Sequence, residues 1–255
     1  MTIDQLGKAR AFAALHVPGS PLVLFNVWDA GTARAVEAGG AEAIATGSWS
    51  VAAANGFGDG EQFPRDLALA NLSRIVAAVS LPVTVDLERG YADDAEGVGR
   101  TVAAAIEAGA VGCNLEDSDA AGALVPVAEQ VERIVQARGA AAPGQFFLNA
   151  RTDVFLQAPP ADHDDALLAA ALARTVEYAA AGADGIFLPG LVDPDLIGAA
   201  VRATDRPVNV MVSEGLPSLA VLSGLGVARV SHGPGPYLAA MSFLQETSRA
   251  AREAS

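Results

Sequence analysis

The sequence predicts a (β/α)8 barrel, an α/β fold in which eight parallel strands are surrounded by helices. Short apolar runs alternate with alanine-rich helical segments, a pattern typical of parallel strands joined by helical crossovers. Eight such units can be counted in 255 residues, a usual length for a one-domain barrel. No Gly-x-Gly-x-x-Gly motif follows the first strand, which argues against the alternative, a doubly wound open sheet. We therefore expect a single barrel domain over residues 1–255.

Each predicted strand is a short apolar run bounded by glycine, proline or polar residues. Runs that are apolar on both faces, such as 82–87 and 112–116, fit strands buried between a barrel interior and outer helices. In chain order, the predicted strands are 22–28, 42–47, 82–87, 112–116, 146–151, 185–189, 207–212 and 228–232.

A helix is predicted after every strand. Gly39, Gly109 and Gly182 each end a helical segment just before the next strand, as helix-terminating glycines do. The last helix, about 235–252, contains an apolar segment at 237–244. In chain order, the predicted helices are 30–38, 65–79, 94–108, 126–139, 163–181, 193–203, 217–224 and 235–252.

The composition excludes several classes of function. A net charge of −14 and a pI near 4.5 predict repulsion from nucleic acid and from anionic membranes, so neither is expected as a partner. No apolar run reaches membrane-spanning length, and the polar start of the chain lacks the apolar segment of a signal peptide. We therefore expect a cytoplasmic protein, and an anionic substrate would need local cations to bind.

Two residue types are too scarce for the chemistry that depends on them. Lys8 is the only lysine and precedes the first strand, which argues against Schiff-base aldolases and pyridoxal enzymes. Cys113 is the only cysteine, so there is no disulfide framework. Strand alternation places Cys113 opposite Asn114 and Glu116, where it is predicted to be a small buried residue facing the outer helices.

Four acidic residues follow apolar runs in the first half of the chain. Asp86 and Glu88 come at the end of one predicted strand, and Glu116 comes at the end of the next. Because side chains alternate along a strand, Asp86 and Glu88 share a face, and that face meets the barrel mouth where parallel barrels keep their active sites. Each acid could also simply cap a helix. Together, converging carboxylates favour a divalent cation with oxygen ligands, Mg²⁺ or Mn²⁺.

The fourth acidic residue, Asp59, lies in an unusually long connection, residues 47–64. Long loops inside compact barrels are usually functional or disordered. Glycines on both sides of Asp59 make this segment flexible enough to bring a carboxylate over the barrel mouth. The alternative is a solvated turn aspartate.

Arg151 ends the predicted strand 146–151, where its guanidinium fits bidentate recognition of a substrate carboxylate. Its alternative role is an ion pair with a neighbouring helix. Trp28 shares a strand face with Asn26 and is predicted either to form a wall of the substrate pocket or to pack in the core. His16 precedes the first strand, on the side of the barrel where residues usually serve stability.

Several motifs together resemble the isocitrate lyase and phosphoenolpyruvate mutase superfamily, especially its short bacterial members. The resemblance covers almost the whole chain, and the ordered set of motifs is more specific than any one of them. The motifs are NVWDA at 26–30, TGS at 46–48, VDLERGY at 85–91, NLED at 114–117, NARTD at 149–153 and GADGIFLPG at 182–190.

The resemblance implies a role for each site residue. Asp86, Glu88 and Glu116 would hold Mg²⁺ directly or through water, with Asp59 beside the metal on a mobile loop. Backbone N–H groups around Gly47 and Ser48 would bind a substrate carboxylate or enolate oxygen, and Arg151 would pair with the carboxylate. The residues assigned to substrate binding are Trp28, Thr46, Gly47, Ser48, Asp86, Arg151 and Asn209.

The loop at 117–126 departs from the family pattern. Isocitrate and methylisocitrate lyases carry a Lys-Lys/Arg-Cys-Gly-His motif after the fourth strand, and phosphoenolpyruvate mutase has a lysine and an Asn-Ser pair there. Here the loop reads DSDAAGALVP and contains no cysteine, lysine or histidine. His232, at the end of the last predicted strand, is then the best candidate to protonate an enolate or orient water, alongside the simpler role of a strand-end cap.

These observations predict a Mg²⁺-dependent carbon–carbon lyase or decarboxylase that acts on a small 2-oxo dicarboxylate through an enolate, with Asp59, Arg151 and His232 as catalytic residues. One alternative is a mutase or hydrolase of phosphoenolpyruvate or phosphonopyruvate. Another is a barrel that binds 2-oxo acids without turning them over. The resemblance also implies a homo-oligomer, a dimer or tetramer in which the last helix is often exchanged.

Overall fold

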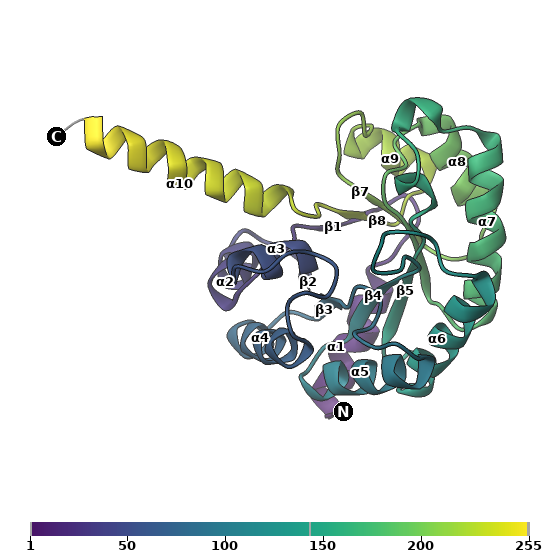
Figure 1. Cartoon of the computed structure of the whole chain (residues 1–255), viewed down its shortest axis with the longest axis horizontal. Helices are drawn as coiled ribbons and strands as arrows, with labels where there is room; N and C mark the ends of the chain where they lie inside the picture. The colour runs from purple at the N-terminus through teal and green to yellow at the C-terminus, as the bar shows by residue number, and fades with distance from the viewer. Residues whose placement is uncertain (1, 143, 254–255) are drawn as a thin grey trace.

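The computed structural model describes residues 2–142 and 144–253, and its eight parallel strands form a nearly closed barrel (Figure 1). This confirms the predicted fold class. The strands are β1 (Leu22–Leu24), β2 (Ile44–Ala45), β3 (Val83–Asp86), β4 (Gly112–Glu116), β5 (Phe147–Arg151), β6 (Gly185–Leu188), β7 (Val208–Met211) and β8 (Arg229–Ser231). Every predicted strand therefore contains an observed one.

Neighbouring strands in the barrel are neighbours in the chain, with β1 paired to β8. The remaining junction, between β1 and β2, is bridged just beyond the two strands. Val27 and Thr46 form an isolated parallel bridge, and the Val27 N–H donates to the carbonyl of Ala45 over 2.8 Å. This junction keeps the ends of β1 and β2 together at the mouth.

The predicted helices after the strands are present with small shifts at their ends. They are α2 (Ala30–Ala38), α4 (Arg65–Ala78), α5 (Ala95–Glu107), α6 (Val127–Gly139), α7 (Asp165–Ala180), α8 (Pro194–Arg202), α9 (Leu219–Leu225) and α10 (Gly235–Glu253). Two short 3-10 turns, Val154–Leu156 and Pro160–Asp162, lead from β5 into α7. Within the described residues, no helix has the length and apolar character needed to cross a membrane.

Two further helices were not predicted. The first, α1 (Ile3–Ala14), begins at Thr2, whose side chain accepts a hydrogen bond from the N–H of Gln5, and it packs under the barrel. Its Phe12 is fully buried against Gly112. A Cβ at Gly112 would lie 3.0 Å from the Phe12 ring and 2.8 Å from the Phe147 carbonyl, so β4 needs glycine there. The second, α3 (Ser48–Ala54), occupies the start of the predicted loop 47–64.

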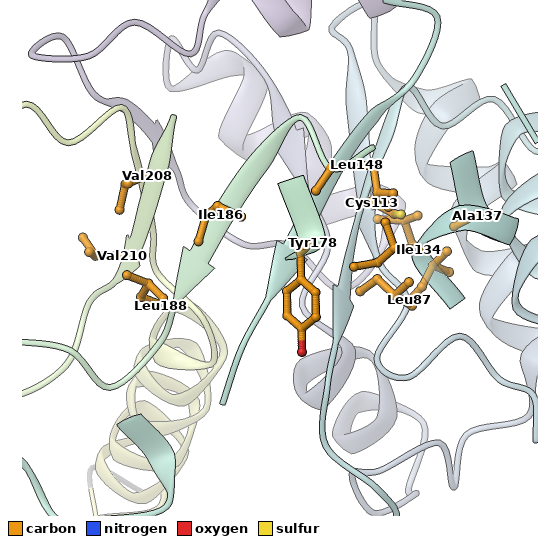
Figure 2. Close-up of a cluster of buried hydrophobic side chains, with 14 of the residues drawn as sticks. Leu87, Cys113, Ile134, Ala137, Leu148, Tyr178, Ile186, Leu188, Val208 and Val210 are labelled. Carbon is orange, nitrogen blue, oxygen red and sulfur yellow. The ribbon is translucent and has the colours of Figure 1, made fainter. Parts of the chain in front are cut away.

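The main core lies between the strands and the outer helices (Figure 2). Ile186 and Leu188 of β6 both contribute to it, as do alternate residues of β7, because side chains two positions apart share a strand face. Cys113 lies in this layer beside Ile134 and is completely buried. Burial raises the pKa of the Cys113 thiol well above its usual value, so this cysteine is an inert core residue, as the strand alternation predicted.

The last helix leaves the barrel. In Figure 1, α10 projects away from the other helices and carries three large exposed apolar side chains, Leu238, Phe243 and Leu244. The outer face of β1 is correspondingly uncovered, with Val23 and Phe25 exposed along a groove beside α2. Exposed apolar side chains on α10 and an exposed apolar groove beside α2 are surfaces that self-association would cover, and exchange of the last helix between subunits stays a prediction.

We expect the protein to self-associate through α10. In sedimentation velocity at micromolar concentration, the wild type should be larger than a monomer. The double variant Phe243→Asp/Leu244→Asp should shift toward monomer, because it places charges in an apolar interface. Gln245→Asp is the matched control, since it adds a charge to the same helix without removing apolar surface. A wild type that sediments as a monomer would contradict the expectation.

His16 is a buried histidine whose protonation is coupled to folding. Its ring is buried, stacks on Phe147 at 3.9 Å between centroids, and binds the Phe12 carbonyl through Nδ1. Nε2 is buried without a partner, so a second proton would be costly. Burial, with the nearby Arg229 charge, lowers the pKa of His16 from 6.5 to about 3. The neutral ring therefore stabilises the fold fully above pH 6.5, and this contribution is lost as the pH falls toward 3.

The expected loss from His16 is about 2 kcal/mol between pH 7 and pH 5. His16→Phe keeps a stacked ring that cannot be protonated. Urea unfolding of the wild type and of His16→Phe at pH 7 and pH 5 gives the difference in unfolding free energy between the two proteins at each pH. Titration of the carboxylates, which both proteins contain, cancels in this difference. If that difference is the same at both pH values, the linkage to His16 is wrong.

Candidate active site

A cavity of about 160 Å³ lies at the carboxyl ends of the barrel strands. Asp86, Arg151 and Ser231, which end three different strands, all reach it. This is the end of the barrel where active sites of this architecture occur. The cavity is lined by Asn26, Gly47, Ser48, Trp49, Ser50, Asp59, Asp86, Asn114, Arg151, Phe187, Met211, Ser231, Gly233 and Pro234.

Asp86 is held by the segment that follows β2. Its backbone N–H donates to Thr46 Oγ1 at 3.0 Å, and its Oδ2 accepts from the Ser48 hydroxyl at 2.8 Å and the Ser48 N–H at 3.3 Å. The other oxygen, Oδ1, is buried and has no hydrogen-bond partner in the described structure. A buried carboxylate oxygen without a partner is costly unless a donor or a cation binds it.

Glu88 is buried beside the cavity rather than lining it. Its carboxylate accepts from the Tyr91 hydroxyl at 2.9 Å and from the Glu61 N–H at 2.5 Å. Burial raises the pKa of Glu88 to about 7, and the neighbouring Asp86 charge contributes in the same direction. An additional positive charge nearby would favour its ionised form.

The loop that carries Asp59 is fastened to the turn after β3. The Glu61 carboxylate accepts from the Arg89 N–H, from the Arg89 guanidinium at 2.6 Å and from the Tyr91 N–H at 2.6 Å. Glu61, Glu88 and Tyr91 are also the non-glycine residues with positive φ in the described chain. Such backbone persists only where surrounding contacts hold it, so Glu61 fixes one position of the loop.

Asp59, two residues before this attachment, lines the cavity at its rim. The surrounding protein raises the pKa of the Asp59 carboxyl, and the charge of Asp86 adds to the effect. The structure thus brings two predicted metal-site carboxylates, Asp59 and Asp86, to the same cavity.

Arg151 is held by two protein carboxylates. Its Nη1 lies 2.7 Å from Glu116 Oε2, while Nε and Nη2 bind the two oxygens of Asp153 at 2.5 and 3.1 Å. These carboxylates raise the pKa of Arg151, which stays cationic. Burial raises the pKa of Glu116, with Arg151 opposing the shift. A guanidinium has five N–H donors, so Arg151 retains donors for a substrate carboxylate.

A second layer of contacts supports Arg151 from behind. Asp117 is completely buried and accepts from the Asp153 N–H at 2.9 Å, from the Tyr178 hydroxyl at 2.8 Å and from Arg174 at 3.1 Å. The Ser118 hydroxyl donates to Asp153 at 2.6 Å. The two residues after β4 therefore fix the carboxylate that orients the guanidinium at the end of β5.

The side chains fit a divalent cation only in part. Within residues 2–142 and 144–253, no three His, Cys, Asp or Glu side chains are grouped closely enough to bind a metal by themselves. Mg²⁺ commonly keeps several waters and binds one or two protein carboxylates. The free Oδ1 of Asp86 fits a direct ligand of this kind, and the buried Glu88 and the partly buried Glu116 fit contacts through water, one of the two arrangements that the resemblance implied.

Several predicted site residues lie elsewhere. Thr46 supports the Asp86 backbone, and Asn209 is buried against Ser231. Neither lines the cavity. Trp28 packs against Tyr237 instead, as the core-packing alternative predicted, and Trp49 of α3 lines the cavity. Gly47 and Ser48 do line it, but the Gly47 N–H already donates to Val27 and the Ser48 N–H to Asp86.

His232 does not reach the cavity. Ser231, just before it, points into the barrel mouth, so alternation turns the His232 ring to the outer side. There it packs on Phe25 and lines a separate surface groove. Its N–H donates to Asn26. The geometry supports the strand-end role and not the predicted role as acid, because β8 places the ring on the other side of the sheet.

The loop at 117–126 is a tight turn closed by its own contacts. Asp119 accepts from the N–H groups of Ala121 and Ala123 at 2.8 and 2.9 Å, and Ser118 bridges to Leu124. The loop brings no proton-transfer group over the cavity. Sequence reasoning had identified Asn114 only as sharing a face with Glu116. Most of the other wall residues that it missed lie at or near strand ends, a signal that marks position but not role, and Trp49 and Ser50 lie on α3.

Comparison with known proteins identifies the class of this barrel. A model of the phosphoenolpyruvate phosphomutase family matches residues 12–252. The chain is 30% identical to 2-methylisocitrate lyase of Escherichia coli K12, over 84% of this chain and 72% of that protein. It is 32% identical to oxaloacetate decarboxylase of Bradyrhizobium sp. BTAi1, over 73% of this chain and 67% of that protein.

A solved structure is closer in sequence. A Burkholderia cenocepacia J2315 protein, named as a candidate phosphonomutase, is 54% identical with a TM-score of 0.94, over 97% of this chain and 99% of that one. The chain belongs to the isocitrate lyase/phosphoenolpyruvate mutase superfamily, as the sequence motifs predicted. This superfamily consists of Mg²⁺-dependent lyases, decarboxylases, mutases and hydrolases that act on 2-oxo acids.

We expect Asp117→Ala to destabilise the protein by about 3 to 5 kcal/mol, because it leaves the largely buried Arg174 without its carboxylate. Urea unfolding measures the change. Asp66→Ala is the matched control, since the Asp66 side chain is exposed and its contact with Arg65 should contribute little. Equal, small effects of the two substitutions would show that the buried network is not a major source of stability.

Proposed function

We propose that the protein is a Mg²⁺- or Mn²⁺-dependent lyase or decarboxylase that acts on a small 2-oxo dicarboxylate and cleaves a carbon–carbon bond to leave an enolate. The observation that carries this proposal is the buried Oδ1 without a partner on Asp86, a residue that lines the same small cavity as Arg151. A 2-oxo acid offers oxygens to the Arg151 guanidinium and to a divalent cation that Asp86 would hold, and the superfamily provides the reaction class.

Different residues of the site position the candidate metal ligand and bind the substrate carboxylate. Ser48 and Thr46 hold Asp86 from one side, so that the free oxygen faces a fixed direction. Arg151, oriented by Asp153, offers its remaining N–H donors to a carboxylate. A bound divalent metal would supply positive charge for the developing enolate oxygen.

The preference for decarboxylation follows from the scarcity of acid–base groups. The cavity walls include no histidine, cysteine or lysine among the described residues, and the loop at 117–126 adds none. Loss of CO₂ needs no proton transfer in the bond-breaking step. Asp59 at the rim, or solvent, can then protonate the product.

Two alternatives remain open to test. The match to the phosphoenolpyruvate phosphomutase model and the 54% identity to a candidate phosphonomutase favour phosphorus–carbon chemistry. The closed turn at 117–126 favours a protein that binds 2-oxo acids without turnover, because nothing in that turn can transfer a proton. The first predicts a different product, and the second predicts no product.

The test is loss of oxaloacetate in the presence of Mg²⁺ and purified protein, measured against the metal-catalysed background. We expect saturable loss that falls to background in Asp86→Ala, because that variant removes the free oxygen. Asp66→Ala, an exposed aspartate outside the cavity, should behave as wild type, and circular dichroism should show that both variants fold. Full activity in Asp86→Ala would rule out the proposed site.

Metal removal gives an independent check. A chelator should abolish the loss of oxaloacetate above background, and added Mg²⁺ or Mn²⁺ should restore it. Release of phosphate from phosphonopyruvate, or its conversion to phosphoenolpyruvate, with no loss of oxaloacetate would replace the proposal with the phosphorus–carbon alternative. Stabilisation by oxaloacetate with no product from either compound would support the binding protein.

A further inference from the structure

A buried arginine and an asparagine at the cavity floor form a polar pair that the proposed mechanism does not use. We propose that Asn114 donates a hydrogen bond from the floor to an anionic oxygen of the bound acid, and that Arg229 is a positioning residue that fixes the Asn114 amide for this task. The inference deepens the proposed function and rests on it, because it requires a 2-oxo acid in the cavity.

Asn114 is placed by the strand register. It lies beside Asp86 of β3 and Asn149 of β5, and its side chain lines the cavity. Its Oδ1 accepts two hydrogen bonds, from Asn149 Nδ2 at 2.9 Å and from Arg229 Nη2 at 3.1 Å. Both lone pairs of this oxygen are therefore used below the floor.

Arg229 determines which way the amide faces. A guanidinium can only donate, so the group of Asn114 that meets it has to be the oxygen. Turning the amide over would place two donors against each other in a buried site, which is costly. The Nδ2 of Asn114 is thus directed away from Arg229 and Asn149, and it has no hydrogen-bond partner among residues 2–142 and 144–253.

Two other polar side chains that line the cavity, Asn26 and Ser231, have partners. Asn26 accepts from the N–H groups of His232 and Gly233 and donates to the Thr46 carbonyl. The Ser231 hydroxyl is shared with Asn209 and Arg229. Among the side chains that line the cavity in the described structure, Asn114 retains free amide donors, and the buried Ser50 hydroxyl is also without a partner.

The charge of Arg229 points to an anion. The Arg229 side chain is completely buried, and its Nη1 has no hydrogen-bond partner. No carboxylate among the described residues lies within 4.0 Å of its guanidinium nitrogens. Burial lowers the pKa of Arg229 to about 9, with the Asp86 charge opposing the shift, so it remains a cation at neutral pH. Arg151 forms ion pairs with two carboxylates, whereas Arg229 forms none among the described residues. An anion on Asn114 would compensate it.

The pair therefore selects for acids with an acceptor oxygen that reaches the floor, opposite the mouth where Asp59 lies. Four variants separate the roles. Asn114→Asp keeps an acceptor oxygen for Arg229 and Asn149 but removes the donors, and Asn114→Ala removes the donors without adding charge. Arg229→Met removes the fixed donor, and Arg229→Lys retains a cationic donor.

Isothermal titration calorimetry with oxalate and Mg²⁺ measures binding without requiring turnover. We expect Asn114→Ala and Arg229→Met to weaken oxalate binding about 10- to 100-fold, the usual effect of losing a hydrogen bond to a charged group. Asn114→Asp should weaken it further through repulsion, and Arg229→Lys should restore most of the affinity. Thr101→Val, which removes a buried hydroxyl on α5 outside the cavity, is the matched control and should bind as wild type.

The outcomes distinguish the inference from the function beneath it. Wild-type affinity in both Asn114 variants overturns the inference while leaving the proposed function intact. Equal losses in Arg229→Met and Arg229→Lys overturn the positioning role, and thermal unfolding shows whether such losses reflect a damaged fold. If the wild type itself does not bind oxalate with Mg²⁺, the proposed function fails and the inference fails with it.

Discussion

The site depends on how one guanidinium is shared. Arg151 lies between Glu116 and Asp153, and without it these two buried carboxylates would repel each other at the mouth of the barrel. The arrangement exists because the parallel register puts the ends of β4 and β5 side by side, with Glu116 opposite Arg151. Asp117 then ties the same two strand ends together from the outer side.

The same register explains why the interior is polar just beneath the cavity. Asn114 of β4 and Asn149 of β5 lie at one level, and Arg229 of β8 reaches the same level across the barrel. A barrel of this type is filled by side chains rather than by solvent, so each polar group needs a partner inside the layer. The carboxylates of the mouth therefore stand above a buried cation, Arg229, which would attract an anionic acid.

The sequence predicted the barrel well because strand and helix signals are local. Apolar runs and helix-ending glycines located every strand, and alternation correctly placed Cys113 against the helices. Alternation also explains why the His232 ring does not line the cavity: Arg229 and Ser231 share the inner face of β8, so the next residue turns outward. The residue type had suggested chemistry, but its position on the strand decided its surroundings.

What sequence reasoning missed depends on short or long-range structure. With seven residues, α3 is too short to show helical periodicity. Because this helix was missed, the prediction named Trp28 as a wall residue, whereas Trp49 of α3 lines the cavity. Packing of α1 under the barrel depends on Phe147, far along the chain. The contact of Asn114 with Arg229 joins residues 115 positions apart, which no local pattern reveals.

The attachment of the Asp59 loop restricts which substitutions evolution can accept at this site. One carboxylate, that of Glu61, satisfies two backbone N–H groups and one guanidinium of the turn after β3, while its own N–H binds Glu88. The left-handed backbone at Glu61, Glu88 and Tyr91 is tolerated only while these bonds exist. Residue 61 and the turn at 88–91 are therefore expected to be replaced together in related sequences, as one inherited unit, rather than one position at a time.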